Sequence, residues 1–274
     1  MTTTLVRGSR TRADRRARDW AEIQERMLVP LYDAVYDRLD VGPSTRLLGL
    51  DCGSGLALLM ASARGATVTG CDGDERRLAL ARERLLPEPQ WGAPTRRHTR
   101  AALRIGGPER PADRKGAPFT MVTALDPASP CAELRPELQE AARLTERGSP
   151  VVLAGWGPSE RCATYRVLCV AARPAEPRGH PVRSRLSGRD DLEELARDAG
   201  LRPDGSGRVA CPFGYPDMDS AVRGLLSTGL FDSAAEATDE HQVEKELAEA
   251  LHPYQRSDGT VRMENVFRYV VARV

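Results

Sequence analysis

The sequence predicts an α/β fold in which helices cover a largely parallel sheet. Short apolar runs alternate with amphipathic stretches along most of the chain, a pattern typical of strand–helix–strand units. The clearest unit is residues 46–72, where an apolar run ends in a glycine-rich turn, a helix pattern follows, and a second apolar run ends at an acid. With 274 residues, the chain is long enough to bury one substantial core.

Two helices are expected before this unit, at residues 19–28 and 30–39, and Pro30 stands at a helix-start position. Residues 1–18 are expected to be a flexible basic tail, because arginine clusters near a terminus are usually solvated. An anion-binding arm is the alternative for this cluster, which consists of Arg7, Arg10, Arg12, Arg15, Arg16 and Arg18.

The remaining elements follow from the hydrophobic period and from glycine and proline breaks. The expected strands are residues 45–50, 66–72, 101–105, 119–125, 150–156 and 265–274. The expected helices are residues 56–64, 74–86, 131–147, 159–172 and 189–200, with a further helical stretch in 216–252. Residues 173–188 are expected to be a loop.

Composition and charge exclude several classes of protein. Hydrophobic residues are 41% and charged residues 29%, with a formal net charge of +1, so a soluble globular protein without a nucleic-acid or membrane partner is expected. The N-terminus lacks the apolar core of a signal peptide, and no later run could span a bilayer, which favours a cytoplasmic location. The cysteines show neither C-x-x-C spacing nor adjacent histidines, so no metal is expected.

The glycine-rich turn has the features of a site for a nucleotide-like ligand. Gly53 and Gly55 lie between a strand and a helix, where backbone N–H groups gather and a ligand can approach the main chain closely. Asp72 ends the second strand about 20 residues later, where an acid can bind a ribose hydroxyl pair. The spacing therefore indicates nucleotide-type binding.

The segment "LLGLDCGSGLALLMASARGATVTGCDGDERRLALARERL" resembles the first motif and following segment of class I S-adenosylmethionine-dependent methyltransferases. With lower specificity, "FTMVTALD", "EAARLTERGSPVVLAGWG", "CPFGYPD" and "FRYVVARV" are similar to small-molecule methyltransferases of bacterial secondary metabolism. The resemblance implies a Rossmann-like, mostly parallel sheet of seven strands with an antiparallel final strand and helices on both faces. The family's N-terminal helices tend to cover the cofactor. Within one expected domain of residues 19–274, the segment 212–256, inserted before the last strand, is expected to be a helical cap over the substrate.

The same resemblance implies S-adenosylmethionine as the cofactor. The loop after the first strand would hold its methionine part, and the acid after the second strand its ribose. The residues matched to cofactor binding are Gly49, Asp51, Cys52, Gly53, Ser54, Gly55, Asp72, Gly73 and Asp126.

The first motif departs from the family's pattern in one place. The family's acid falls on Gly49, and its first glycine falls on Asp51. A shift of two residues would make Asp51 the acid and Ala57 the last small residue, but it would disturb the spacing to Asp72. The unshifted register is preferred, and Asp51 is expected to be tolerated, because a helix N-terminus stabilises a carboxylate.

Two further departures concern acids. No residue after the third strand clearly matches the family's adenine-binding acid, and Asp113 is a poor candidate for it. Thr120 stands where the fourth strand commonly has an acid. Both changes bear on the expected cofactor affinity, and neither abolishes the fold.

Methyl transfer can depend on alignment and exclusion of water, so the sequence need not contain a catalytic dyad. His252, with Tyr254 nearby, is the candidate base, and a surface or capping histidine is the alternative. Aromatic residues that could line a substrate site, or simply pack in the core, are Trp20, Tyr32, Tyr36, Phe213, Tyr215 and Phe231.

The leading hypothesis is an S-adenosylmethionine-dependent methyltransferase that acts on a small-molecule acceptor, with a homodimer allowed. The alternative is a catalytically inactive protein on the same fold that serves as a binding or regulatory partner.

Overall fold

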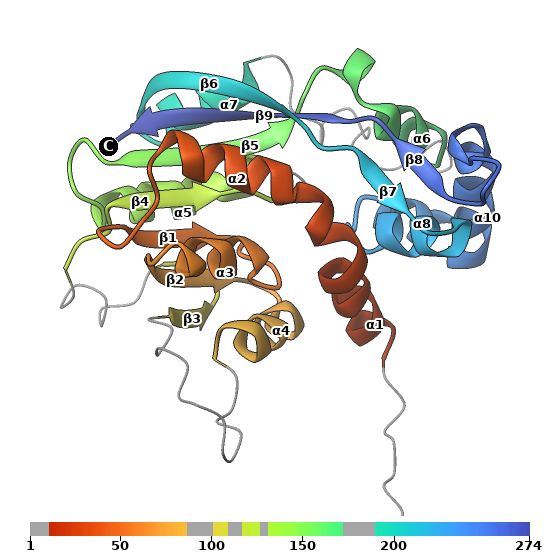
Figure 1. Cartoon of the computed structure of the whole chain (residues 1–274), viewed down its shortest axis with the longest axis horizontal. Helices are drawn as coiled ribbons and strands as arrows, with labels where there is room; N and C mark the ends of the chain where they lie inside the picture. Colours follow the sequence, from red (N-terminus) through yellow and green to blue (C-terminus); the bar gives the residue numbers. More distant parts are fainter. Residues whose placement is uncertain (1–10, 87–100, 109–116, 127–130, 172–189) are drawn as a thin grey trace, which may run out of the picture.

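The computed structural model describes residues 11–86, 101–108, 117–126, 131–171 and 190–274 (Figure 1). The loop expected at 173–188 and the candidate Asp113 lie outside these ranges. Within the described part of the chain, no helix combines the length and apolar character needed to cross a membrane.

Seven strands form one sheet in the order β3-β2-β1-β4-β5-β9-β6. Neighbouring strands are parallel except at β9, which runs antiparallel to both β5 and β6. This topology confirms the expected fold class. The strands are β1 (Arg46–Leu50), β2 (Thr67–Asp72), β3 (Ala101–Ile105), β4 (Met121–Ala124), β5 (Pro150–Trp156), β6 (Arg202–Ala210) and β9 (Val266–Arg273).

Helices cover both faces of this sheet, as expected (Figure 1). Because side chains alternate across a strand, Leu47 of β1 joins the apolar core on one face and Leu48 joins the core on the other. The first core includes side chains of α2 (Val29–Arg38), α3 (Leu56–Ala63), α4 (Glu75–Leu85) and α6 (Ala163–Ala171). The second includes side chains of α5 (Cys131–Arg143) and α7 (Asp191–Asp198).

Helix α5 is shorter than the expected 131–147. Its last turn is followed by Thr145, whose hydroxyl donates to the carbonyl of Ala141 and whose backbone bridges Phe119 beside the sheet. The chain therefore leaves the helix to pair next to β4. A short 3₁₀ turn, η4 (Ser159–Arg161), precedes α6.

The N-terminal region is one helical run with an irregular middle. It contains α1 (Arg12–Asp19), a π-helix η1 (Trp20–Gln24), a 3₁₀ helix η2 (Glu25–Leu28) and α2. The expected flexible tail was therefore wrong for residues 12–18, which form α1. A capping box between Thr11 and Asp14 starts this helix.

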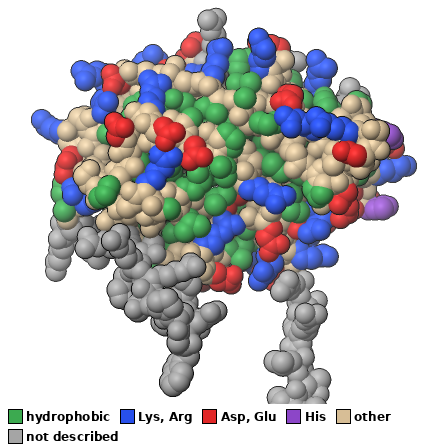
Figure 2. Space-filling view, viewed as in Figure 1, with side chains coloured by type: hydrophobic (Ala, Val, Ile, Leu, Met, Phe, Trp, Pro, Cys, Tyr) green, Lys and Arg blue, Asp and Glu red, His purple; other side chains and the backbone are tan. Residues whose placement is uncertain are grey.

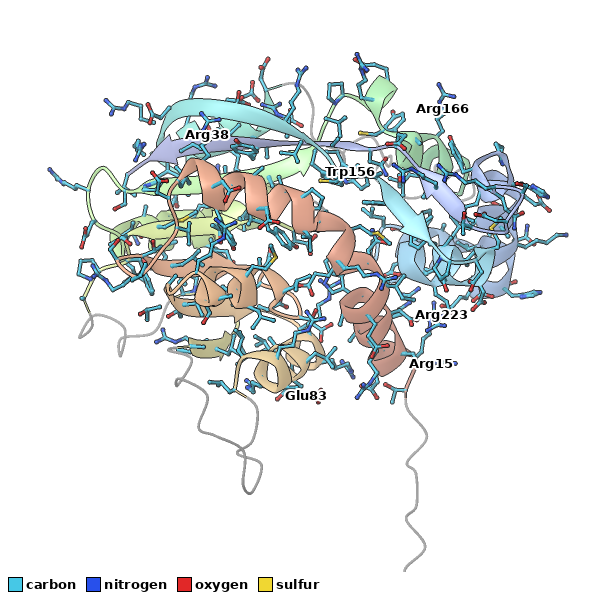
Figure 3. All side chains as sticks on the ribbon, viewed as in Figure 1. Arg15, Arg38, Glu83, Trp156, Arg166 and Arg223 are labelled. Atoms are coloured by element: carbon cyan, nitrogen blue, oxygen red, sulfur yellow. The ribbon has the colours of Figure 1, made fainter. Side chains whose placement is uncertain are left out.

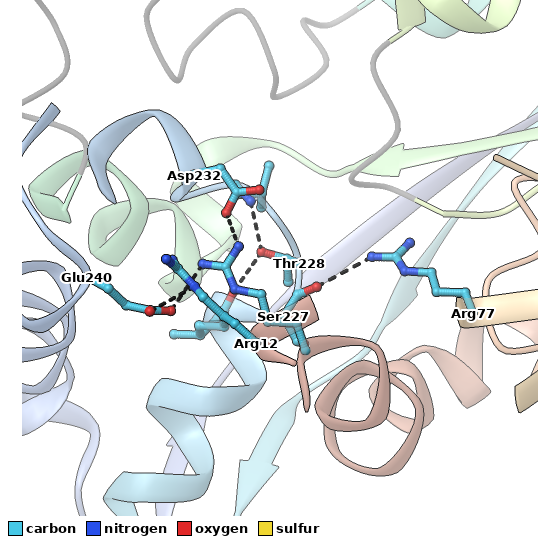
Figure 4. Close-up of polar contacts among 9 residues, drawn as sticks. Arg12, Arg77, Ser227, Thr228, Asp232 and Glu240 are labelled. Atoms are coloured by element: carbon cyan, nitrogen blue, oxygen red, sulfur yellow. Dashed lines mark hydrogen bonds and ion pairs between the residues drawn. The ribbon is translucent and has the colours of Figure 1, made fainter. Parts of the chain in front are cut away.

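Two arginines of α1 contact the helical insert that precedes the last strand. Arg12 pairs with Glu240 at 2.8 Å, and Arg16 pairs with Asp232 at 2.5 Å (Figure 4). On the same side of the molecule, Arg223 of α8 (Met218–Leu226) lies near Arg15 of α1 and pairs with Asp19 (Figure 3). Two of the arginines, Arg7 and Arg10, lie outside the described residues.

A mainly helical insert lies before the last strand, as expected. It consists of α8 (Met218–Leu226), α9 (Asp232–Ala237), α10 (Glu240–Leu251) and the 3₁₀ turn η7 (His252–Tyr254). Gly229, with φ +74°, follows α8, and the Asp239 side chain caps the start of α10. A two-stranded sheet of β7 (Phe213–Tyr215) and β8 (Val261–Met263) flanks these helices and was not expected.

Positive and negative side chains alternate over the face shown in Figure 2, in agreement with the small net charge. Large single-sign regions are not seen on this face. The surface therefore gives no electrostatic reason to expect a polyanionic partner at this face.

Candidate functional site

The turn between β1 and α3 has the backbone of a ligand-binding loop. Asp51, Gly53 and Gly55 all have positive φ, at +44°, +57° and +79°. Glycine adopts this conformation without cost, and aspartate is one of the few other residues that tolerates it. Asp51 thus occupies a position where glycine is the usual residue, as the unshifted register predicts.

Two glycines of the motif are required for packing. A Cβ atom on Gly49 would lie 2.9 Å from Cδ2 of Leu58, and one on Gly55 would lie 2.9 Å from Cβ of Ala81. Gly55 also forms the N-cap of α3. A side chain at Gly49 would therefore have to displace the end of the Leu58 side chain, whereas one at Gly55 would meet the Cβ of Ala81.

Asp72 holds the loop in place from the end of β2. One carboxylate oxygen accepts a hydrogen bond of 2.7 Å from the Gly53 N–H, and the other accepts one of 2.7 Å from the Asp74 N–H. The side chain is 6% exposed, and burial raises its pKa to about 6 despite these two bonds. Asp72 therefore has a structural function, and each oxygen keeps a lone pair for a further donor.

A second buried carboxylate lies at the start of α3. Glu25 of η2 is 2% exposed; one oxygen accepts from the Ser54 hydroxyl and from Arg84 Nη1 at 2.5 Å. Its other oxygen accepts from the Leu56 N–H at 3.3 Å. Burial raises the pKa of Glu25, while Ser54 and Arg84 oppose that shift.

Trp20 covers the loop. A Cβ atom on Gly53 would lie 3.0 Å from Nε1 of Trp20, so the indole sits directly against the glycine backbone. The guanidinium of Arg77 stacks 4.6 Å from the centre of the indole ring and pairs with Asp126 at 3.4 Å. The indole N–H is buried and has no hydrogen-bond partner among the described residues.

A small cavity remains between these groups at the carboxyl ends of β1 and β4. Its volume is about 20 Å³, and a cavity of about 10–15 Å³ is enough for one water molecule. Sites for small molecules usually measure about 300–1,000 Å³. The lining residues are Trp20, Glu25, Tyr32, Gly49, Leu50, Asp51, Cys52, Gly53, Ala57, Leu58, Thr123, Leu125 and Asp126.

Most of the expected cofactor residues therefore come together. Gly49, Asp51, Cys52, Gly53 and Asp126 line the cavity. The others of that set lie behind the loop or beside it: Ser54 bonds Glu25, Gly55 packs on α4, Asp72 supports the loop, and Gly73 is exposed with open space around it.

Of the expected substrate-lining aromatics, Trp20 and Tyr32 line the cavity. The other aromatics do not line it and are fully packed, with exposures of 2% or less. Tyr36 donates to the carbonyl of Ala57, and Tyr215 donates to the side chain of Gln24. Phe213 packs against Trp156 and Phe267, and Phe231 belongs to the same core.

The candidate base is not at this cavity. His252 is exposed in η7, and Tyr254 donates to the carbonyl of Ala163 in α6 at 3.4 Å. Neither side chain lines the cavity at the strand ends. The surface alternative for His252 agrees with its exposure.

Thr120 is at the opposite end of the strands. Its hydroxyl accepts a hydrogen bond of 2.8 Å from the Arg46 N–H, where β1 begins. A carboxylate at this position could accept the same bond, so threonine preserves the link between β1 and β4. Thr120 therefore lies at the amino end of the strands, away from the cavity at their carboxyl ends.

Sequence reasoning missed Glu25, Arg84 and Arg77. Glu25 lies in a charged helical stretch and Arg84 on an amphipathic helix, so both resemble ordinary surface residues in the sequence. Their contacts join η2, the loop and α4, which no local spacing reveals.

No family model matches the sequence, and no curated protein matches it. Among solved structures, the chain is similar to YcgJ of Bacillus subtilis, at 14% identity and a TM-score of 0.55, covering 89% of this chain and 98% of that one. It is also similar to the (4+2)-cyclase SpnF, at 17% identity and a TM-score of 0.51, covering 89% and 80%. A third similar structure is magnesium protoporphyrin IX methyltransferase of Synechocystis PCC 6803 with bound S-adenosylhomocysteine, at 15% identity and a TM-score of 0.50, covering 95% and 93%.

At this level of identity the likenesses show the fold. The chain has the Rossmann-like fold of class I methyltransferases.

Proposed function

We propose that the chain binds S-adenosylmethionine at the β1–α3 loop and transfers its methyl group to a small-molecule acceptor. The observation that carries this proposal is the placement of Gly53, Asp72 and Asp126 at the carboxyl edge of a sheet with methyltransferase topology. Ligands of open α/β sheets bind outside this edge. The solved relative with bound S-adenosylhomocysteine supports the same cofactor class.

The chemistry of the site fits this cofactor. Asp72 has lone pairs left for ribose hydroxyls, and the Trp20 N–H is a buried donor without a partner among the described residues. The carboxylates of Asp51 and Asp126 suit a cationic ligand, and Tyr32 and Leu125 supply apolar walls. The cavity volume of about 20 Å³ does not admit the cofactor in this conformation, so Trp20 and its neighbours must move for binding.

When bound, the cofactor would supply a methyl group on a sulfonium, which a nucleophile displaces in line. The contribution of this chain would be to align the reactants and to exclude water beneath Trp20. Resemblance in sequence extends the proposal to acceptors of bacterial secondary metabolism and to a cytoplasmic protein that can form a homodimer.

Calorimetric titration with S-adenosylmethionine and S-adenosylhomocysteine tests the proposal. Asp72→Ala should weaken the affinity about tenfold or more, because charge-assisted hydrogen bonds to the ribose are lost. The matched control is Glu75→Gln, an exposed carboxylate three residues further along the chain. No binding by the wild-type protein at millimolar ligand would contradict the proposal.

The alternative is a protein on this fold that binds without catalysing methyl transfer. The solved structure of a cyclase with similar topology shows that this fold does not fix the reaction. Methylation of an acceptor by the wild-type protein, lost in Asp72→Ala, would exclude this alternative.

A further inference from the structure

The groups that contact the Glu25 side chain form a binding site for a carboxylate. The Ser54 hydroxyl, Arg84 Nη1 and the Leu56 N–H all donate to its two oxygens. These donors lie at the N-terminus of α3, where the helix dipole and unpaired N–H groups favour an anion. A guanidinium beside a helix N-terminus is a strong receptor for a carboxylate.

This receptor is held in place independently of Glu25. Arg84 Nη1 also donates to the carbonyl of Ser54 at 3.0 Å and to its hydroxyl at 2.9 Å, and both acceptors lie in the loop rather than in η1 or η2. Ser54 itself is fully buried in the loop. If Glu25 left, these three donors would lose their acceptor, and another carboxylate could take its place.

Glu25 reaches this site from the irregular part of the N-terminal run. The run is a π-helix in η1 and a 3₁₀ helix from Glu25 onward, and departures from regular α-helix within a run often mark hinges and functional sites. Trp20 begins the same irregular part and covers Gly53. One movement of η1 and η2 would withdraw both side chains from the loop.

A second observation also indicates a missing ligand. Trp20 is 3% exposed, and its indole N–H faces the loop and has no hydrogen-bond partner among the described residues. Burying a donor without a partner costs free energy, so a ligand atom that accepts from this N–H would be favoured here.

We propose that Ser54, Arg84 and the Leu56 N–H form the receptor for the carboxylate at the amino-acid end of the cofactor, and that Glu25 occupies it as an internal competitor. Binding then exchanges one carboxylate for another while η1 and η2 move outward. This inference rests on the proposed function, since it assigns residues to one end of the same cofactor.

Two ligands separate this inference from the proposed function. S-adenosylhomocysteine carries the amino-acid end, whereas 5′-methylthioadenosine has the nucleoside and sulfur but no carboxylate. Calorimetry with both ligands on wild type and Glu25→Gln should show a gain of about tenfold for S-adenosylhomocysteine, because the competing anion is removed. The affinity for 5′-methylthioadenosine should change by less than about threefold.

The double variant Glu25→Gln/Arg84→Gln removes the guanidinium without leaving a buried charge, and it should lose the gain. Glu22→Gln is the matched control, since Glu22 lies on the same run with its side chain 67% exposed. Far-UV circular dichroism and thermal melting identify any variant that fails to fold.

An equal gain in affinity for both ligands would show that Glu25 only blocks space. The proposed carboxylate receptor would then be wrong. No gain in affinity for S-adenosylhomocysteine in folded Glu25→Gln, or a loss of it, would also overturn the receptor. If 5′-methylthioadenosine still bound, the proposed function would stand. If neither ligand binds any variant, both proposals fail.

Discussion

The two ends of strand β1 are built in opposite ways. At the amino end, the Arg46 N–H bonds Thr120, and the Arg46 side chain pairs with Glu146 at 2.6 Å, with both side chains at least 35% exposed. At the carboxyl end, Asp51 has a left-handed backbone and Glu25 is buried as a carboxylate. At the amino end, the named polar groups form a hydrogen bond and an exposed ion pair. The carboxyl end instead contains a strained backbone and a buried charge.

The features that reduce the stability of the fold are therefore concentrated at the carboxyl end of β1. Left-handed backbone at a non-glycine residue, a buried carboxylate and an unpartnered N–H each cost free energy of folding. Five residues of one strand separate these costs from the regular end of the sheet. Unfavourable features collected at one edge, next to shifted pKa values, are typical of a functional site.

The largest expected change in stability follows from breaking the buried ion pair between Arg84 and Glu25. Arg84→Gln removes the cation that pairs with Glu25, which would leave a buried carboxylate without its charged partner. We expect the free energy of unfolding to fall by about 3–5 kcal/mol at pH 7, measured by urea denaturation. Arg46→Gln at the amino end should cost less than about 1 kcal/mol, because its ion pair is exposed.

Adding Glu25→Gln to Arg84→Gln should restore most of the lost stability, since no charge is then buried alone. Equal losses in Arg84→Gln and Arg46→Gln would show that the two ends of β1 do not differ energetically.

The next effect is a dependence on pH. Burial raises the pKa of Asp72 to about 6, above its ordinary value of 3.8, so the folded chain holds this proton more tightly than the unfolded chain. Its contribution to stability is therefore complete below about pH 4 and is lost as the pH rises through about 6. The loss is on the order of 2–3 kcal/mol.

Asp72→Asn cannot titrate, so the difference in unfolding free energy between wild type and variant should change between about pH 4 and pH 6. Urea denaturation at several pH values measures that difference, and other titrating groups cancel from it. A difference that stays constant from pH 4 to pH 7 would mean that Asp72 titrates alike in both states.

Much of the fold could be predicted because it depends on local pattern. Apolar runs in the sequence predicted the parallel strands of the large sheet. Gly65 and Gly200, with φ of +97° and +81°, follow helices that were expected to end there. The pairing of β7 with β8 escaped prediction because each strand has three residues and their partners are far apart in sequence. Long-range pairing of such short runs leaves no local signal.

The site could be predicted only in part for a similar reason. Gly53 and Asp72 are joined by a hydrogen bond because their positions follow from the strand–turn–helix–strand register. Glu25 and Arg84 come from elements on either side of the loop, and only the tertiary packing makes them partners. Sequence also could not show that Trp20 closes the loop, because an aromatic residue there suits core packing equally well.

The smallest expected effect concerns Asp51. A left-handed backbone costs an ordinary residue about 1–2 kcal/mol and aspartate less, while glycine in its place adds about 0.5–1 kcal/mol of unfolded-state entropy. Asp51→Gly should therefore change the free energy of unfolding by less than about 1 kcal/mol, measured by urea denaturation.

The same variant also reports on the charge of Asp51. Because this carboxylate contributes to the raised pKa of Asp72, its removal should lower that pKa and shift the pH dependence described above toward acid. Affinity for S-adenosylmethionine should stay unchanged or weaken, since the carboxylate at the cavity suits the cofactor's amino group. A gain of about tenfold or more would instead show that Asp51 blocks the site, and it would favour the inactive alternative. The affinity of Asp51→Gly thus decides whether Asp51 is tolerated in a functional cofactor site or prevents the cofactor from binding.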